Sequence, residues 1–379
     1  MSSHVISYDS KQSISELLSS WTRLQWHPDS DFEYYLKIME MEPELKPYIL
    51  GLHENGEIKT LLVGSIKRMP VELRFGYKVF PSPNFNVFVL GYNGILGKTD
   101  KLECTVLFDA LVKLLHRRKF DIILFGNLPL YSPFHDLALS GVPFSSRDHF
   151  RIKQESWQLS MPASMDKYWS DHKSLRHYNR RYFSNKLLKK YDNRMQITCY
   201  NSVGKLDMIL QDTEHIVTRT WQRRLGATSF LTEDNRKRYE FYIDNGWLYA
   251  YILYIDHNPV CFLHGVKYHS IFYAQQIGYD PEYKEDRIGN YLMIHVIQDL
   301  CERGGIHTVD FGVGNSEAKR IFCDVCVDAE DIYVFGPAMY LKAFNLMRAS
   351  LTAIHLASKS LLKRVGLYGS LRKYWRHTK

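Results

Sequence analysis

The chain contains the segment Gly278-Tyr-Asp-Pro-Glu-Tyr-Lys-Glu-Asp-Arg-Ile-Gly-Asn290, which separates two contrasting patterns of apolar residues. Residues 271–279 before it predict a strand, and residues 288–303 after it have apolar side chains at helical spacing. Unpaired backbone amides and the helix dipole favour an anion at such a helix start. The missing side chain of Gly289 lets a pyrophosphate approach the backbone closely. We expect the phosphates of a bound ligand to lie at Arg287, Ile288, Gly289 and Asn290.

The elements predicted around this segment follow an order that occurs twice in the chain. In the second half, strands are predicted over 247–255, 259–268 and 271–279, a helix over 288–303 and a strand over 307–311. In the first half, an Asn55-Gly56 hairpin signal, a helix over 101–119 and an apolar strand over 121–125 repeat this order. The repetition indicates a duplicated α/β fold, with chance similarity of two α/β halves as the alternative.

Length and charge indicate a two-domain body with a basic end. A chain of 379 residues exceeds the usual size of one compact core. The net charge is +8, but residues 338–379 hold nine Lys or Arg and no Asp or Glu, which leaves −1 (+8 less 9) for the rest. A near-neutral body is unusual for a dedicated nucleic-acid binder. The basic end is compatible with an anionic membrane surface, another polyanion or a solvated helix face.

Cysteine spacing and hydropathy argue against a metal centre, secretion and a membrane span. The one C-x-x-C, at Cys323 and Cys326, has no second pair at zinc-like spacing. The N-terminal residues lack the apolar core of a signal peptide, and no run of about 18 apolar residues is present. We expect no metal and a cytoplasmic location, with peripheral association at the inner face of the membrane as a further expectation.

Residues 157–324 carry several motifs in a characteristic order. These motifs are Ser174-Leu-Arg-His-Tyr-Asn-Arg-Arg181, Trp221-Gln-Arg-Arg-Leu-Gly226, Gly278-Tyr-Asp280, Gly289-Asn-Tyr-Leu292, and Asp310-Phe-Gly-Val-Gly314 with Lys319. Together they resemble the GNAT acyltransferase superfamily. More narrowly, they resemble its bacterial branch linked to cellulose and exopolysaccharide biosynthesis, which is related to the Fem peptidoglycan aminoacyl transferases. The first half of the chain is similar only as a degenerate partner module.

The resemblance implies an α/β (α+β) fold of two tandem GNAT-like modules, each with a mixed, mainly antiparallel sheet flanked by helices. We expect a degenerate module over residues 1–155 and a donor-binding catalytic module over 156–336. A basic amphipathic C-terminal helix and tail are expected over 337–379. Only the second module is expected to retain a complete donor site.

The resemblance also implies an N- or O-acyltransferase that moves an acyl group, such as acetyl, from acetyl-CoA or another acyl-CoA to an amine or hydroxyl. The implied acceptor is a small molecule or a glycan- or lipid-linked precursor of the cell envelope or a polysaccharide. The donor loop is poorer in Gly and Arg than the usual acetyl-CoA loop, and Arg287-Ile-Gly289 stands where the branch commonly has Ser-Pro-Gly. The carrier therefore stays open between coenzyme A, an acyl carrier protein and aminoacyl-tRNA.

Two other function classes are kept as alternatives. One is a Fem-like transferase, the only case in which tRNA is an expected partner. The other is a non-catalytic module that binds a membrane surface or nucleic acid. A P-loop NTPase is not expected, because Gly94-Ile-Leu-Gly-Lys-Thr99 has Tyr92 where the motif needs Gly.

Enzymes of the resembled type attack an activated thioester directly, so they need a proton acceptor and positioning groups. His264, in a predicted strand, is the first candidate base, with a hydrogen-bonded structural histidine as the alternative. Asp310, at the end of an apolar strand, is the second candidate, although it can also cap the next turn. Substrate contacts are expected from Trp221, Arg224, Gln275, Tyr279 and Lys319.

Two basic segments interleave apolar residues at helical spacing. Residues 172–194 and the C-terminal region are both predicted to form amphipathic helices. The C-terminal stripe comprises Tyr340, Phe344, Met347, Leu351, Ile354, Leu361 and Val365. We expect this helix to dock on a membrane surface or an anionic substrate, or alternatively to pack on the second module.

Overall fold

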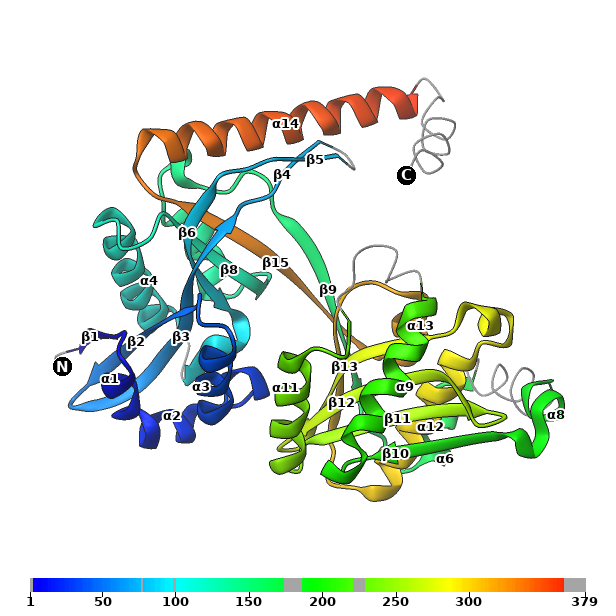
Figure 1. Cartoon of the computed structure of the whole chain (residues 1–379). Coiled ribbons are helices and arrows are strands. Elements are labelled where there is room, and N and C mark those ends of the chain that lie inside the picture. Colours follow the sequence, from blue (N-terminus) through cyan, green and yellow to red (C-terminus); the bar gives the residue numbers. More distant parts are fainter. Residues whose placement is uncertain (1–2, 76–77, 98–99, 174–185, 221–228, 365–379) are drawn as a thin grey trace. The chain divides into compact units, whose positions relative to one another are not determined.

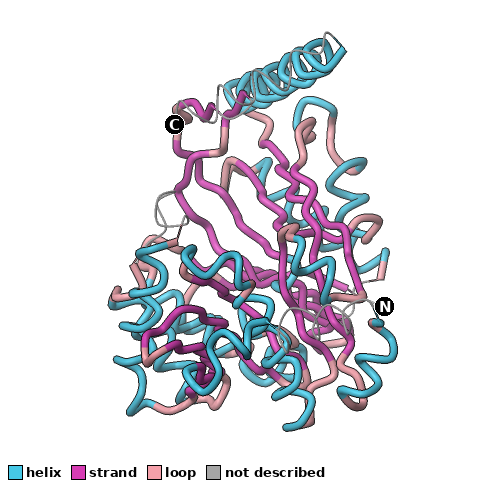
Figure 2. Tube along the Cα trace, turned by 90° about the vertical axis from the view of Figure 1, so that its right-hand side faces the viewer, coloured by secondary structure: helices cyan, strands magenta, loops and turns pink. Residues whose placement is uncertain are grey.

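The computed structural model describes residues 3–75, 78–97, 100–173, 186–220 and 229–364 (Figure 1). The chain divides into two compact units. Unit 1 comprises Met1–Lys153 and Asp328–Lys379, and unit 2 comprises Gln154–Val327. Both units are mixed α/β structures in which helices flank the strands (Figure 2), so the predicted fold class is confirmed.

Unit 1 is built on a mixed sheet with the strand order β1-β2-β3-β6-β8-β15, and β7 pairs with β3. The strands are β1 (Ser3–Tyr8), β2 (Lys46–Glu54), β3 (Glu57–Pro70), β6 (Asn84–Gly91), β7 (Ile95–Gly97), β8 (Ile122–Pro129) and β15 (Val325–Phe335), with β4 (Leu73–Phe75) and β5 (Lys78–Phe80) as a separate pair. The predicted hairpin joins β2 to β3, and Asn55 and Gly56 have φ values of 52° and 86°. Positive φ at both central residues is what a two-residue turn of this type requires.

The helices of unit 1 are α1 (Lys11–Ser15), α2 (Leu18–Leu24), α3 (Phe32–Met41), α4 (Lys101–His116), α5 (Pro133–Ser140) and α14 (Met339–Arg364). Leu107 and Leu111 of α4 pack against Phe88 and Phe125 of the sheet, and all four side chains are buried. This apolar face explains why α4 follows helical spacing along its length.

Unit 2 has the strand order β9-β14-β13-β12-β11-β10. The strands are β9 (Ile152–Ser160), β10 (Met195–Tyr200), β11 (Leu248–Ile255), β12 (Asn258–Tyr268), β13 (Ile271–Tyr279) and β14 (Thr308–Val313). The pairing of β13 with β14 is parallel, and the other pairings along this order are antiparallel. The mainly antiparallel sheet expected for the second half is therefore present.

The helices of unit 2 are α6 (Met165–Asp171), α8 (Leu188–Tyr191), α9 (Leu206–Arg219), α11 (Glu233–Asp244), α12 (Ile288–Arg303) and α13 (Glu317–Phe322), with the 3-10 helix η7 (Pro281–Asp286) before α12. His264 of β12 contacts Thr213 of α9 and Tyr239 of α11. The preceding residue of the strand, Leu263, shares a core with Leu292 of α12. Because successive strand residues face opposite sides, α9 and α11 cover one face and α12 the other.

In each unit, one strand of the sheet follows, in the sequence, a helix of the other unit. β9 follows α5 of unit 1 but pairs with β14, and β15 follows α13 of unit 2 but pairs with β8. Residues 328–336, expected in the second module, therefore lie in unit 1. A local pattern predicts that a strand exists but does not identify its partner, which is why the expected and observed bounds differ.

The predicted C-terminal helix is present as α14 and packs on unit 1, not on the second module. Phe344 of the predicted stripe is buried, whereas Tyr340, Met347, Ile354 and Leu361 are exposed. None of the described helices, α14 included, has the combined length and hydropathy that a bilayer-spanning segment needs. Val365 lies outside the described residues, as do residues 174–185 of the other predicted amphipathic helix.

Candidate functional site

The two parallel strands of unit 2 separate after a short ladder. β13 pairs with β14 at Ile271–Thr308, Phe272–Val309 and Tyr273–Asp310. β13 nevertheless continues to Tyr279. Within the described part of the chain, residues 274–279 therefore have no ladder on their β14 side, and that strand edge can bond to a ligand instead.

A β-bulge lies next to this separation. His264 pairs with Gln276 and Gly265 pairs with Ala274, so Gln275 is the extra residue on β13. Bulges redirect side chains and are frequent next to active sites. Gln275 and Gln276 are both exposed, and the amide nitrogen of Gln275 is 3.4 Å from the Tyr242 hydroxyl.

The strand edge leads directly to the start of α12. Arg287 precedes the helix with φ 55° and ψ 37°, and no side chain in the described residues caps the helix. The amides of Asn290 and Tyr291 donate to the Arg287 carbonyl, at 3.1 and 3.2 Å. The amides of Ile288 and Gly289 lie in the first turn, where no carbonyl of the helix accepts from them. They are therefore available to an anion.

Gly289 leaves room at this helix start. A Cβ built at Gly289 lies 3.5 Å from Cδ1 of Tyr279 and meets no other group within that distance. Tyr279 is 37% exposed and belongs to the sheet face that α12 covers, because it pairs with Cys261 of the same core. The structure thus places Tyr279 beside Gly289.

Two carboxylates of the 280–286 segment are paired with basic residues from other elements. The Asp280 carboxylate accepts from Arg219 Nη1 at 2.8 Å and from the Glu282 amide at 3.0 Å. The Asp286 carboxylate accepts from Lys190 Nζ at 2.7 Å and from the Tyr191 hydroxyl at 2.6 Å. These pairs fix the segment and reduce the negative charge near the helix start.

His264 lies inside a buried polar cluster on the opposite face. Its ring is 2% exposed, with Nδ1 2.7 Å from the Tyr239 hydroxyl and Nε2 3.4 Å from Thr213 Oγ1. Thr213 donates its own proton to the Ile209 carbonyl at 2.6 Å. Both ring nitrogens of His264 therefore face hydroxyl groups of the protein.

Burial lowers the pKa of His264 to about 3, so the ring is neutral at neutral pH. Both ring nitrogens contact hydroxyl groups of the protein. The Tyr239 hydroxyl also donates to Gln276 Oε1 at 3.2 Å, which connects the histidine to the bulge. The arrangement suits His264 to orienting Tyr239 and Gln276.

Asp310 lies where β14 leaves both of its neighbours. It is the last residue of the ladder to β13, and the pairing to β9 becomes irregular after Asp310–Gln158. Its carboxylate accepts from Gln158 Nε2 at 2.9 Å and from the Gly312 amide at 2.6 Å. Two bonds leave a carboxylate with further acceptor capacity, and Asp310 is only partly buried. Asp310 therefore caps the turn and can accept a further hydrogen bond.

Lys319 holds the loop after β14. Its Nζ donates to the carbonyls of Gly312 and Val313, at 3.1 and 2.9 Å. Burial lowers the pKa of Lys319, while Cys323 and Asp310 act in the opposite direction. In the structure Lys319 thus holds the loop after β14 through these two carbonyls.

The strand pairing shows which face of the sheet carries Asp310. Asp310 pairs with Tyr273, which pairs with Val266, so Asp310 shares the face of His264 and Gln276. Trp221 and Arg224 lie outside the described residues.

Several residues of the site were not predicted from the sequence. They are Gln158, Arg219, Thr213 and Tyr239. Each contacts a residue at least 25 positions away, so no local spacing marks it. Among the described residues, no three His, Cys, Asp or Glu side chains are grouped to hold a metal ion.

Comparison with known proteins gives a family for part of the chain. Residues 174–320 match the family model described as an acetyltransferase (GNAT) domain. No curated protein sequence matches the chain.

Solved structures match over most of the chain at low identity. FemX has a TM-score of 0.54 and 10% identity, covering 88% of this chain and 98% of its own. A tandem GNAT protein from the clavulanic acid biosynthesis pathway has a TM-score of 0.51 and 9% identity, covering 89% and 100%. The C-terminal domain of a putative lysylphosphatidylglycerol synthetase from Agrobacterium fabrum has a TM-score of 0.51 and 10% identity, covering 90% and 97%.

These matches show the fold of the chain. Sequence identities of 9–10% are too low for a conclusion about activity. The family model covers the strand edge, the bulge and the uncapped start of α12 described above. Residues 174–320 thus match the model of an acetyltransferase (GNAT) domain, and the chain is similar in fold to FemX and to a tandem GNAT protein.

Proposed function

We propose that unit 2 is an acyltransferase that uses an acyl-CoA donor. The observation that carries this proposal is the continuity of three features: the open edge of β13, the Gln275 bulge and the uncapped start of α12. An extended arm with amide groups can lie along the strand edge, and a pyrophosphate can lie at the helix start. A coenzyme A thioester combines both groups in one molecule.

The residues present fit such a donor. The amides of Ile288 and Gly289 and the charge of Arg287 would hold its phosphates. The backbone of residues 274–279 would hold its amide-bearing arm through the groups that β14 leaves unpaired. When bound, an acyl-CoA supplies an acyl carbonyl that is already activated as a thioester.

Asp310 is the proposed proton acceptor. It would take the proton of the attacking amine or hydroxyl, directly or through one water, while Gln158 and the Gly312 amide hold the carboxylate in place. His264 is proposed as a positioning residue. Its occupied nitrogens and its pKa of about 3 make it a poor base, and its bond to Tyr239 orients the bulge.

The acceptor class is proposed from the chemistry named in two of the matched structures. FemX and the lysylphosphatidylglycerol synthetase domain share the fold, and a lipid is part of the second name. We place the acceptor among glycan- or lipid-linked precursors that carry an amine or hydroxyl. Such precursors would be met at the inner face of a membrane, including those of polysaccharide biosynthesis.

A ligand-dependent stability measurement tests the donor. The melting temperature of the full chain would be recorded with acetyl-CoA, a longer acyl-CoA, free CoA and an aminoacyl-tRNA. Because a ligand that binds the native state stabilises it by mass action, CoA species should raise the melting temperature with concentration. A rise with aminoacyl-tRNA alone would instead assign a Fem-like donor. No rise with any of the four would contradict an acyltransferase site.

A further inference from the structure

One face of α14 attaches the helix to unit 1 through buried polar groups. Arg348, 3% exposed, donates from Nη1 to the Asp148 carboxylate at 2.6 Å and from Nη2 to the Phe150 carbonyl at 3.1 Å. Asn345 donates to the carbonyls of Ser145 and Arg147, at 3.1 and 2.8 Å. A buried, fully bonded guanidinium holds its element in one position, because breaking the pair leaves a charge in an apolar site.

The opposite face of the same helix is exposed and apolar. Its large side chains are Met339, Tyr340, Leu346, Met347, Ile354 and Leu361, which are between 45% and 78% exposed. They recur at steps of seven, from Met339 to Leu346 and from Tyr340 through Met347 and Ile354 to Leu361, so they form one stripe along the helix. Alanine and serine fill the positions between them, and this stripe contains no charged residue.

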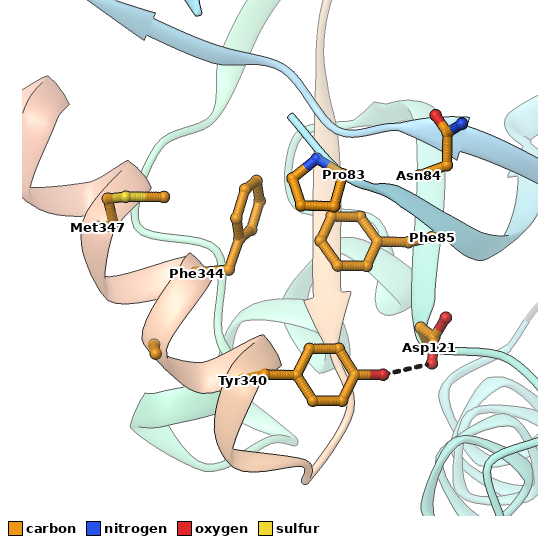
Figure 3. A pocket seen from close by; sticks show the side chains of 8 residues that line it. Pro83, Asn84, Phe85, Asp121, Tyr340, Phe344 and Met347 are labelled. Carbon is orange, nitrogen blue, oxygen red and sulfur yellow. Dashed lines mark hydrogen bonds between the residues drawn. The ribbon is translucent and has the colours of Figure 1, made fainter. Parts of the chain in front are cut away.

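The first turns of this stripe form one wall of a pocket with a volume of about 420 Å³ (Figure 3). Tyr340, Phe344 and Met347 of α14 face Pro83 and Phe85 across it. The Tyr340 hydroxyl donates to the Asp121 carboxylate at 2.9 Å, so the one acidic group of the lining is occupied. The pocket is thus an apolar recess that opens beside an apolar helix face.

Charge selects the partner of this surface. Residues 338–379 hold nine Lys or Arg and no Asp or Glu. Lys359, Lys363 and Arg364 lie in the last two turns of α14, beyond most of the apolar stripe. Two copies of this helix placed face to face in parallel would bring these basic ends together, which disfavours such a pair as the occupant.

We propose that the exposed face of α14 is a membrane-binding surface for anionic lipids, and that the pocket beside it accepts one lipid acyl chain. A helix with an apolar face and Lys or Arg at its edge lies in the interfacial region of a bilayer. Apolar burial and attraction to anionic headgroups then add to one another. The inference rests on unit 1 alone and holds whether or not unit 2 transfers acyl groups.

Vesicle co-sedimentation of the full chain tests the surface. Binding is expected with vesicles of phosphatidylcholine and phosphatidylglycerol, and little with phosphatidylcholine alone. Leu346→Glu and Ile354→Glu, at side chains 64% and 55% exposed, should each reduce binding at least tenfold. Leu102→Glu is the matched control, since Leu102 is 75% exposed in the first turn of α4, where an acidic residue is favourable.

A triple change of Lys359, Lys363 and Arg364 to Gln tests the charge. It should lower binding to anionic vesicles by about fivefold per residue. Equal binding of all variants, or equal binding to neutral and anionic vesicles, would overturn the proposal. A dimer in light scattering that Leu346→Glu dissociates, without vesicle binding by the native protein, would overturn it in favour of a second copy.

Ala343→Phe tests the pocket separately, because Ala343 lines it and is exposed. The added ring fills the recess while increasing apolar surface. If an acyl chain enters the pocket, vesicle binding should fall about threefold or more. Unchanged or stronger binding would overturn the acyl-chain part of the proposal, and circular dichroism with a melting curve would verify that each variant is folded.

Discussion

The starts of α4 and α12 occupy the same place in the element order of their units, yet only one is open to a ligand. Asp100 Oδ1 accepts from the amides of Leu102 and Glu103 at 3.1 and 3.0 Å, and Glu103 accepts from the Asp100 amide at 3.2 Å. This capping box gives α4 its own anion. The start of α12 has Arg287 and Gly289 and no side-chain cap among the described residues. Equivalent helix starts can therefore differ in capping through three or four residues.

The strands that precede α4 and α12 also differ, because one is paired to its end and the other is not. In unit 1, β6 pairs with β8 from Val87–Ile122 to Gly91–Gly126, so the ladder reaches the end of β6. In unit 2, the ladder of β13 stops at Tyr273, six residues before the strand ends at Tyr279. A closed ladder has no edge for a ligand, whereas an open one does. The comparison supports a proposal of one donor site per chain, in unit 2.

The largest expected effect is on turnover. Asp310→Asn keeps the size and the bond to the Gly312 amide but removes the proton acceptor. We expect kcat to fall by roughly 10²–10⁴, the range for loss of a general base, with donor affinity unchanged. Steady-state kinetics with donor binding in parallel would measure both. Native turnover in Asp310→Asn would exclude Asp310 as the base.

Arg287→Asp should place a carboxylate at the start of α12, as Asp100 does at the start of α4. The left-handed conformation at Arg287 tolerates Asp, so folding should persist. Donor affinity should fall about 100-fold, because hydrogen bonds to charged groups contribute about 1.5–3 kcal/mol. Lys205→Asp, an equal charge change at the start of α9, is the control. Equal affinities of the two variants would show that net charge, not the helix start, governs binding.

The pH dependence of stability tests the buried state of His264. Its native pKa of about 3 lies below the ordinary value of 6.5, so the unfolded state binds more protons between these two values. Stability should therefore decrease as pH falls from 6.5 towards 3, by about 2 kcal/mol at pH 5. His264→Gln should lack this component. Urea unfolding at pH 7 and pH 5 would measure it, and identical pH dependence in both proteins would contradict the assignment.

The smallest effect is expected in unit 1. Asp100→Ala removes the cap of α4 and should lower the free energy of unfolding by about 1 kcal/mol. Donor affinity should not change, because β6, the strand before α4, is paired with β8 to its end. Asp244→Ala, at the end of α11, is a control for loss of an Asp that caps no helix start. Weaker donor binding in Asp100→Ala but not in Asp244→Ala would contradict the proposal that the donor site lies in unit 2.

The sequence predicts the site segment better than the contacts around it. The strand ending at Tyr279 and the helix beginning near Arg287 follow from local periodicity and a Gly-containing start, and both are present. The capping box at Asp100 and Glu103 is also a local signal in the sequence. Gln158 could not be predicted as a partner of Asp310, because the two lie 152 residues apart.

The C-terminal helix shows the limit of hydrophobic patterning. The apolar stripe predicts which residues should be buried, yet the face attached to unit 1 contains Asn345, Arg348 and Thr352. Asp148 and backbone carbonyls satisfy these polar groups, and such partners are invisible in a local pattern. Most of the predicted stripe is therefore left exposed. Strand exchange between the units eludes local patterns for the same reason, since a partner is a nonlocal property.

Isothermal titration of Gly289→Val with acetyl-CoA and free CoA tests the central claim most directly. Gly204→Val is the control, because a Cβ at Gly204 meets nothing within 4 Å, in the same unit. We expect one site per chain in the native protein and in the control. In Gly289→Val, affinity should fall at least tenfold while the melting temperature is retained. Two sites per chain, or native affinity in Gly289→Val, would contradict a single donor site at the start of α12.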